Sequence, residues 1–172
     1  MILAAVVTIS DSVVAGRRED RSGVALKERI EARGWSVSWY DVLPDEADVI
    51  SAKLSDLADV DHAQVVVTTG GTGMALRDVT PEATRAVIDR EIPGVSEVMR
   101  SEGRKSTPLA ALSRGLTGSR GTTLIVNLPG SPKGAVESFD AIADLIPHMV
   151  DLLHGKTQHE PDASAVSKQK LL

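Results

Sequence analysis

The sequence of 172 residues contains no cysteine. Disulfide frameworks, thiolate metal sites and cysteine nucleophiles are therefore excluded, and the composition is compatible with a reducing cytoplasm. The sequence also lacks any run of lysine and arginine long enough to follow a nucleic-acid backbone, and its formal net charge is −5. We therefore expect no nucleic-acid partner, and any anionic ligand must be bound by a local site.

Long hydrophobic runs are missing as well. The N-terminal segment MILAAVVTIS is apolar, but it is shorter than the roughly 20 residues that a membrane-spanning helix needs, and it lacks the features of a signal peptide. It is typical of a first strand, and we expect a cytoplasmic protein that does not enter a membrane. The length fits one domain, expected over residues 1–154, and the polar residues 155–172 are predicted to form a disordered tail.

Apolar runs of strand length alternate with helical patterns along the chain. Strands are expected at Leu3 to Ile9, Val37 to Val42, Val65 to Thr69 and Thr123 to Asn127. Helices are expected from about Ser22 to the residue before Gly34, over 45–57, 81–89 and 95–101, and over 136–153 as one long helix kinked at Pro147. This order predicts an α/β fold with three layers, α/β/α, and a mostly parallel central sheet.

Four polar segments each follow a predicted strand directly. They are Ser10-Asp11, Pro44-Asp45-Glu46, the glycine-rich segment 70–73 and the segment NLPGSP at 127–132. Ligands of open α/β sheets bind beyond the carboxyl ends of the strands. We therefore expect these segments to lie at one edge of the sheet and to form the functional site.

The stretch VVVTTGGTGMALRDVTPE, residues 65–82, joins a strand to a helix through a glycine-rich turn. Gly70, Gly71 and Gly73 permit positive φ angles and a close approach of backbone N–H groups to an anion, although they could equally serve the turn alone. Thr80 is the expected N-cap of the following helix. The third glycine of a dinucleotide fingerprint is absent, and no GxxxxGK[ST] motif occurs. Any phosphate site here follows a different design.

Asp45 and Asp78 follow two different strands. Each could be a helix-cap or first-turn carboxylate with no ligand. Together they form a pair of hard oxygen donors suited to Mg²⁺, which typically binds one or two carboxylates together with substrate phosphates. A cation at this position would neutralise phosphate charge and stabilise a phosphoryl transition state.

Other polar residues have both a functional and a structural interpretation. Asn127, the only asparagine, either ends a strand or binds a polar ligand edge. Ser113 and the arginines at 77, 114 and 120 are candidate anion contacts, and each could also be an ordinary surface residue. The four histidines lack the spacing of metal ligands, so we assign no metal to them.

Taken together, these segments resemble the MogA/MoaB family of molybdenum cofactor biosynthesis, which includes the G domain of gephyrin. The likeness runs over residues 3–153 and depends on the ordered segments SDSVVAGRREDRSG, LPDE, VVVTTGGTGMALRDVTPEAT, TPLAALSR and TTLIVNLPGSPKG. It implies a fold that is usually a homotrimer and binds molybdopterin. In catalytic members Mg-ATP is the co-substrate: the terminal phosphate of the pterin attacks the α-phosphorus of ATP, and adenylyl-molybdopterin and pyrophosphate are formed.

The resemblance also implies roles for individual residues. The two essential acidic positions of the family match Asp45 of LPDE and Asp78 of RDVTPE, which are expected to be catalytic and to bind Mg²⁺. Nucleotide or pterin contacts are expected from Ser10, Asp11, Gly70, Gly71, Thr72, Gly73, Ser113, Asn127, Gly130 and Ser131. Two alternatives stay open: a non-catalytic pterin-binding or scaffold protein of the MoaB type, and a pyrophosphatase related to the CinA family.

Overall fold

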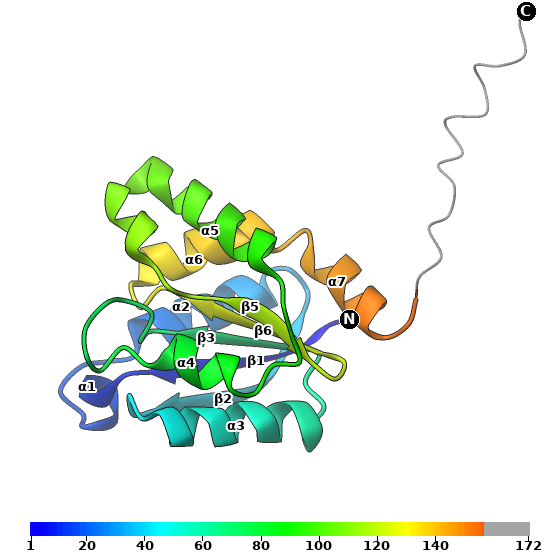
Figure 1. The fold of residues 1–172 in the computed structure, drawn as a ribbon, viewed down its shortest axis with the longest axis horizontal. Helices are drawn as coiled ribbons and strands as arrows, with labels where there is room; N and C mark the ends of the chain where they lie inside the picture. The colour runs from blue at the N-terminus through cyan, green and yellow to red at the C-terminus, as the bar shows by residue number, and fades with distance from the viewer. Residues whose placement is uncertain (157–172) are drawn as a thin grey trace, which may run out of the picture.

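A computed structural model describes residues 1–156, so that the predicted tail lies outside the described residues apart from its first two positions. The strands are β1 (Leu3–Ile9), β2 (Ser36–Leu43), β3 (Val65–Thr69), β4 (Arg90–Glu91), β5 (Thr117–Arg120) and β6 (Thr123–Leu128). They form one sheet in the order β2-β1-β3-β6-β5-β4, of which Figure 1 labels all strands except β4. The first four strands in this order are parallel, and β5 and β4 are antiparallel to their neighbours.

Helices cover both faces of the sheet. They are α1 (Asp11–Val14), α2 (Arg21–Glu31), α3 (Ala47–Asp59), α4 (Thr80–Arg85), α5 (Pro93–Ser106), α6 (Pro132–Ile142) and α7 (Ile146–Leu153), with a 3₁₀ helix η1 (Pro108–Leu112). Helices α2, α5, α6 and α7 pack on one face, where Phe139 is fully buried, and α3 and α4 pack on the other. The predicted three-layer α/β/α fold is confirmed (Figure 1).

The central strands are buried on both sides because their side chains alternate between the two cores. Val6 and Val67 contribute to the core under α2 and α6, whereas Val7 and Val66 contribute to the core under α3 and α4. This arrangement explains why the sequences of these strands are continuously apolar rather than alternating between apolar and polar residues. None of the helices within residues 1–156 combines the length and the apolar character needed to cross a membrane.

Several predicted boundaries are wrong. The segment 136–153 belongs to two helices, because α6 ends at Ile142 and α7 begins at Ile146. Pro147 lies in the first turn of α7, where its missing N–H costs no hydrogen bond. Thr80 does not cap α4: Val79 occupies the cap position, and the Thr80 hydroxyl donates to the carbonyl of Gly70 at 3.0 Å.

Three short elements have no apolar pattern and escaped prediction. They are α1, β4 and β5. The sequence of β5 is Thr-Gly-Ser-Arg, and the strand is held by pairing with β6 on one side and β4 on the other. Its stability therefore comes from tertiary pairing, which a local sequence pattern does not reveal.

Candidate functional site

Two cavities meet at the carboxyl edge of the parallel strands, where the four predicted polar segments converge. We call one the Asp45 cavity; it has a volume of about 480 Å³. We call the other the Ser113 cavity; it has a volume of about 430 Å³. The Asp45 cavity is lined by Ser10, Asp45 and Gly70, among others, and the Ser113 cavity by Thr72, Gly73, Ser113 and Asn127, among others. Both are lined by Gly71, Asp78, Gly130 and Ser131.

The glycine-rich loop after β3 is packed too closely to carry side chains at two positions. Gly70 and Gly71 have φ angles of +103° and +62°. A Cβ atom on Gly70 would lie 2.3 Å from the carbonyl oxygen of Ile9, and one on Gly71 would lie 2.3 Å from Thr80 Oγ1. Glycine is therefore required here both by conformation and by space.

Asp45 is clamped to Asp11, the first residue of α1. The backbone N–H of Asp11 donates to Asp45 Oδ2 at 2.8 Å, and the backbone N–H of Asp45 donates to Asp11 Oδ1 at 3.0 Å. Burial raises the pKa of the Asp45 carboxyl, the hydrogen bond from Asp11 opposes this, and the nearby negative charges of Asp11 and Asp78 raise it further. A bound cation would favour the ionised form of Asp45 in this setting.

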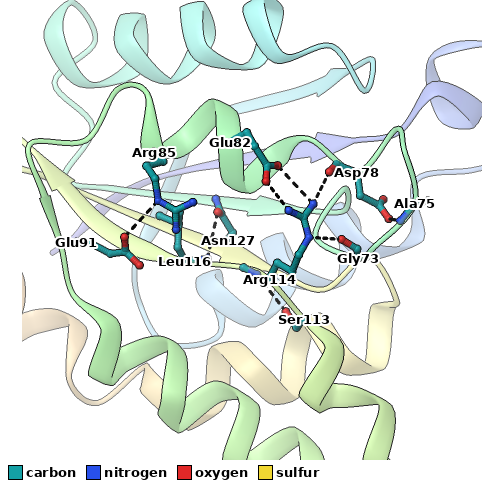
Figure 2. A network of polar contacts seen from close by, with 11 residues as sticks. Gly73, Ala75, Asp78, Glu82, Arg85, Glu91, Ser113, Arg114, Leu116 and Asn127 are labelled. Atoms are coloured by element: carbon teal, nitrogen blue, oxygen red, sulfur yellow. Dashed lines mark hydrogen bonds and ion pairs between the residues drawn. The ribbon is translucent and has the colours of Figure 1, made fainter.

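Asp78 lies at the far end of the loop that begins at Gly73. Its Oδ2 accepts a hydrogen bond from the N–H of Ala75 at 2.8 Å, and its own N–H donates to the carbonyl of Ala75 at 2.9 Å (Figure 2). The side chain thus closes the loop on itself. Asp78 also lines both cavities, so this residue lies where ligands in the two cavities would meet.

The two carboxylates fit the donor set of a magnesium site. Asp45 Oδ2 and Asp78 Oδ2 accept hydrogen bonds, and within residues 1–156 the other oxygen of each carboxylate accepts none from the protein. Asp45 Oδ1 faces the loop, 3.2 Å from the position of a Cβ atom on Gly71. In this described part of the chain, no group of three or more His, Asp or Glu side chains could hold a metal alone, so substrate phosphates and water would have to supply the remaining ligands.

The other predicted contacts surround these two residues. Ser10 is the N-cap of α1 and accepts a hydrogen bond from the N–H of Val13, and Ser131 is the N-cap of α6 and accepts one from the N–H of Gly134. Gly130 approaches the glycine loop, because a Cβ atom there would lie 3.2 Å from the Cα of Gly70. The two cap residues thus lie at helix N-termini that line the Asp45 cavity.

Two residues expected to contact ligand have their polar atoms occupied by the protein. Asn127 is buried, its Oδ1 accepts from the N–H of Leu116 at 3.3 Å, and its Nδ2 donates to the hydroxyls of Thr68 and Thr84 at 3.0 and 2.9 Å. The carboxylate of Asp11 accepts from Asp45 and from Arg77, which hold the pKa of Asp11 below its usual range, and the residue lines neither cavity. In both residues, the polar side-chain atoms already bind protein groups.

The three candidate arginines also bind protein groups. Arg77 pairs with Asp11, and Arg114 pairs with Glu82. Arg120 pairs with Asp59 and lies at the opposite edge of the sheet, because β5 runs antiparallel to β6 and ends beside its first residue. Of the two interpretations left open for Arg120, its ion pair and its position away from this site therefore favour the ordinary surface residue.

Sequence reasoning missed a network around Asp20 at the outer wall of the Asp45 cavity. Asp20 caps α2 by accepting from the N–H of Gly23 at 2.9 Å, and it also accepts from the hydroxyls of Thr8, at 2.6 Å, and Tyr40. Burial and the Asp20 carboxylate raise the pKa of Tyr40. The signal available in the sequence was the capping position of Asp20 before Arg21-Ser22-Gly23.

Comparison with known proteins identifies the family. The model of a family described as "Probable molybdopterin binding domain" matches residues 5–148. The chain belongs to this family. The resemblance to MogA/MoaB proteins that the sequence predicts is therefore confirmed.

Several relatives are similar to this chain along most of its length. A Helicobacter pylori molybdopterin adenylyltransferase is 42% identical over 152 residues, which cover 87% of this chain and 86% of that protein. The Drosophila melanogaster molybdenum cofactor synthesis protein cinnamon is 45% identical over 149 residues, which are 86% of this chain but only 25% of that protein. Among solved structures, the molybdopterin biosynthesis enzyme MoaB from Thermus thermophilus is similar with a TM-score of 0.85 and 46% identity, covering 90% of this chain and 98% of that one.

Proposed function

We propose that this protein adenylylates molybdopterin with Mg-ATP and releases pyrophosphate. The observation that carries the proposal is the position of Asp45 and Asp78, which come from the ends of different strands and line one cavity beside the glycine-rich loop. Relatives named molybdopterin adenylyltransferase, with 36–42% identity over most of the chain, support the same reaction.

The two cavities suggest how the substrates are divided. We assign the triphosphate of ATP to the Asp45 cavity, near Ser10, and the pterin to the Ser113 cavity, near Thr72. The reacting phosphates then meet where the cavities join, at Gly71, Asp78, Gly130 and Ser131. Backbone N–H groups of the loop from Gly70 to Gly73 are suited to binding phosphate oxygens there.

The chemistry requires little covalent participation by the protein. An oxygen of the terminal phosphate of the pterin forms a bond to the α-phosphorus of ATP, the bond from that phosphorus to the bridging oxygen of the β-phosphate breaks, and pyrophosphate leaves with that electron pair. Asp45 and Asp78 would hold Mg²⁺ through the carboxylate oxygens that accept no hydrogen bond within residues 1–156, and this ion would offset phosphate charge in the transition state. The loop and the two cap residues align the reacting groups, which accounts for most of the rate in phosphoryl-type transfer.

A pyrophosphate assay, together with a separate titration of pterin binding, distinguishes this proposal from its alternatives. The protein is incubated with Mg-ATP, with and without molybdopterin, and pyrophosphate is measured in the presence and absence of a chelator. Pyrophosphate that requires both the pterin and Mg²⁺ supports the proposal. Release that is independent of the pterin would instead identify a pyrophosphatase like those of the CinA family, and pterin binding without turnover would identify a non-catalytic protein of the MoaB type.

We also propose that the protein works in the cytoplasm as a homotrimer, as the family resemblance implies. Analytical ultracentrifugation of the full chain tests the oligomeric state. A sedimentation mass near three chains supports the homotrimer, and a monomer at micromolar concentration contradicts it.

A further inference from the structure

Two nitrogens of the Arg114 guanidinium group bind the loop that carries Asp78. Its Nε donates to the carbonyl of Gly73 at 2.6 Å, and its Nη2 donates to the carbonyl of Asp78 at 2.6 Å (Figure 2). Its own backbone N–H donates to the carbonyl of Thr72 at 2.9 Å. The Arg114 side chain is therefore hydrogen-bonded to both ends of the loop from Gly73 to Asp78.

Glu82 fixes the orientation of this guanidinium group. Arg114 Nη1 and Nη2 both donate to the Glu82 carboxylate, and the ion pair holds the pKa of Glu82 below its usual range. Glu82 lies on α4, which is held in the core by buried neighbours that include Thr80 and Ala83. The loop is thereby tied through Arg114 to a fixed helix.

The loop itself has little other support. Leu76 is fully exposed and Met74 is 73% exposed, so neither side chain packs against the body of the protein. A hollow of about 380 Å³ lies against the loop and α4, and Arg114 and Glu82 are among the residues that line it. Within the loop, Arg77 forms an ion pair with Asp11 of α1.

We propose that Arg114 is a positioning residue for adenylyl transfer, which holds Asp78 in place by bridging the carbonyls of Gly73 and Asp78 to Glu82. The proposal depends on the proposed function for its effect on turnover, but not for its effect on the loop. It assigns Arg114 no contact with substrate. A lysine cannot replace it, because a single ammonium group cannot span the same three acceptors in a fixed plane.

The test compares Arg114→Lys with the matched control Arg120→Lys. Arg120 makes contacts of the same kind, to the Asp59 carboxylate and the Val87 carbonyl, at the opposite edge of the sheet. We expect Arg114→Lys to lower kcat for pterin-dependent pyrophosphate release by about 10- to 100-fold with a nearly unchanged KM for the pterin, since a small displacement of a positioned group can cost this much. Arg120→Lys should keep the kcat of the original protein.

Hydrogen exchange provides a readout that does not need activity. The N–H groups of Ala75 and Asp78 are hydrogen-bonded within the loop, and in Arg114→Lys we expect peptides covering 73–78 to exchange about 10-fold faster, with no change in Arg120→Lys. Unchanged exchange in Arg114→Lys would overturn the proposal, as would faster exchange with full turnover. If the unsubstituted protein releases no pyrophosphate but the exchange result holds, the proposed reaction fails and the anchoring of Asp78 by Arg114 stands.

Discussion

Arg77 and Asp11 join the loop that carries Asp78 to the start of α1 across 66 residues of sequence. Arg77 Nη2 lies 2.6 Å from Asp11 Oδ2, and Arg77 Nε donates to the same oxygen at 3.0 Å. The other Asp11 oxygen accepts from the N–H of Asp45. Arg77 thus forms an ion pair with Asp11. Asp11 in turn orients the backbone at Asp45 by accepting a hydrogen bond from its N–H group.

Replacing Asp11 with alanine should therefore impair the site although Asp11 lines neither cavity. Asp11→Ala removes the acceptor for both Arg77 and the N–H of Asp45, and we expect kcat to fall about 10- to 100-fold and more Mg²⁺ to be needed for half-maximal activity. Asp11→Asn keeps an acceptor for Asp45 and should be less affected. Steady-state kinetics over a Mg²⁺ titration measures both effects, and equal activity of Asp11→Ala and the unsubstituted protein would show that the clamp has no role.

Asp78→Asn tests the proposed metal role directly. The amide keeps an acceptor for the N–H of Ala75 but removes the negative charge, so the loop should hold its shape while adenylyl transfer falls about 100-fold or more. Pterin affinity, measured by fluorescence titration or calorimetry, should change little. Normal turnover by this variant would contradict the assignment of Asp78 as a magnesium ligand.

Gly71→Ala should cost both stability and activity. The substitution places a Cβ atom against Thr80 Oγ1 and near Asp45 Oδ1 in a backbone with positive φ. Gly34→Ala is the matched control, because Gly34 has a φ of +77° and open space around its Cβ position. We expect Gly34→Ala to lower the free energy of unfolding by about 1 kcal/mol with full activity. Gly71→Ala should lower the free energy of unfolding by more than this and should abolish most turnover. Urea unfolding and activity assays measure both effects, and similar results for the two variants would argue against the steric requirement at Gly71.

Alanine substitutions at Asn127 and Ser113 should have different effects on stability and on pterin binding. Asn127→Ala leaves buried partners at Thr68, Thr84 and Leu116 without their hydrogen bonds, and we expect it to lower the free energy of unfolding by about 3 kcal/mol. Within residues 1–156, the Ser113 hydroxyl accepts one hydrogen bond, from the N–H of Gly115 at 3.3 Å. Ser113→Ala should therefore change stability by less than about 1 kcal/mol and weaken pterin binding by about 2- to 10-fold. Denaturant titration and binding measurements distinguish the two effects. An Asn127→Ala protein of unchanged stability but with weakened ATP binding would contradict the structural role and would support the nucleotide contact expected from the sequence.

The Asp59–Arg120 pair predicts a pH dependence of stability away from the site. Arg120 holds the pKa of Asp59 below its ordinary value of 3.8, so the ionised carboxylate favours the folded state. This contribution is present above the pKa of the unfolded chain and is lost as the pH falls through the lower folded pKa. The difference in free energy of unfolding between the original protein and Asp59→Asn should be constant from about pH 5 to 7 and should shrink below about pH 4. A difference that grows on acidification, in urea titrations at several pH values, would contradict the assigned direction.

The sequence by itself determined the layered fold, the parallel core strands and the edge at which the polar segments meet. Apolar runs such as Val65 to Thr69 are long enough to report burial on both faces, and the glycine-rich turn and Pro81 mark where such a strand gives way to a helix. The carboxyl ends of adjacent parallel strands must share an edge, so Asp45 and Asp78 could be assigned to one site before any coordinates were known.

Only the tertiary structure decided which polar side chains face the cavities and which bind the protein. Asn127, Asp11 and Arg114 have the same chemistry as ligand-binding residues, and their partners lie between 11 and 66 residues away in the chain. Hydrogen bonds over such separations depend on strand order and register, which no local pattern encodes. For the same reason β5, whose four residues contain no large apolar side chain, becomes a strand only through its neighbours β6 and β4.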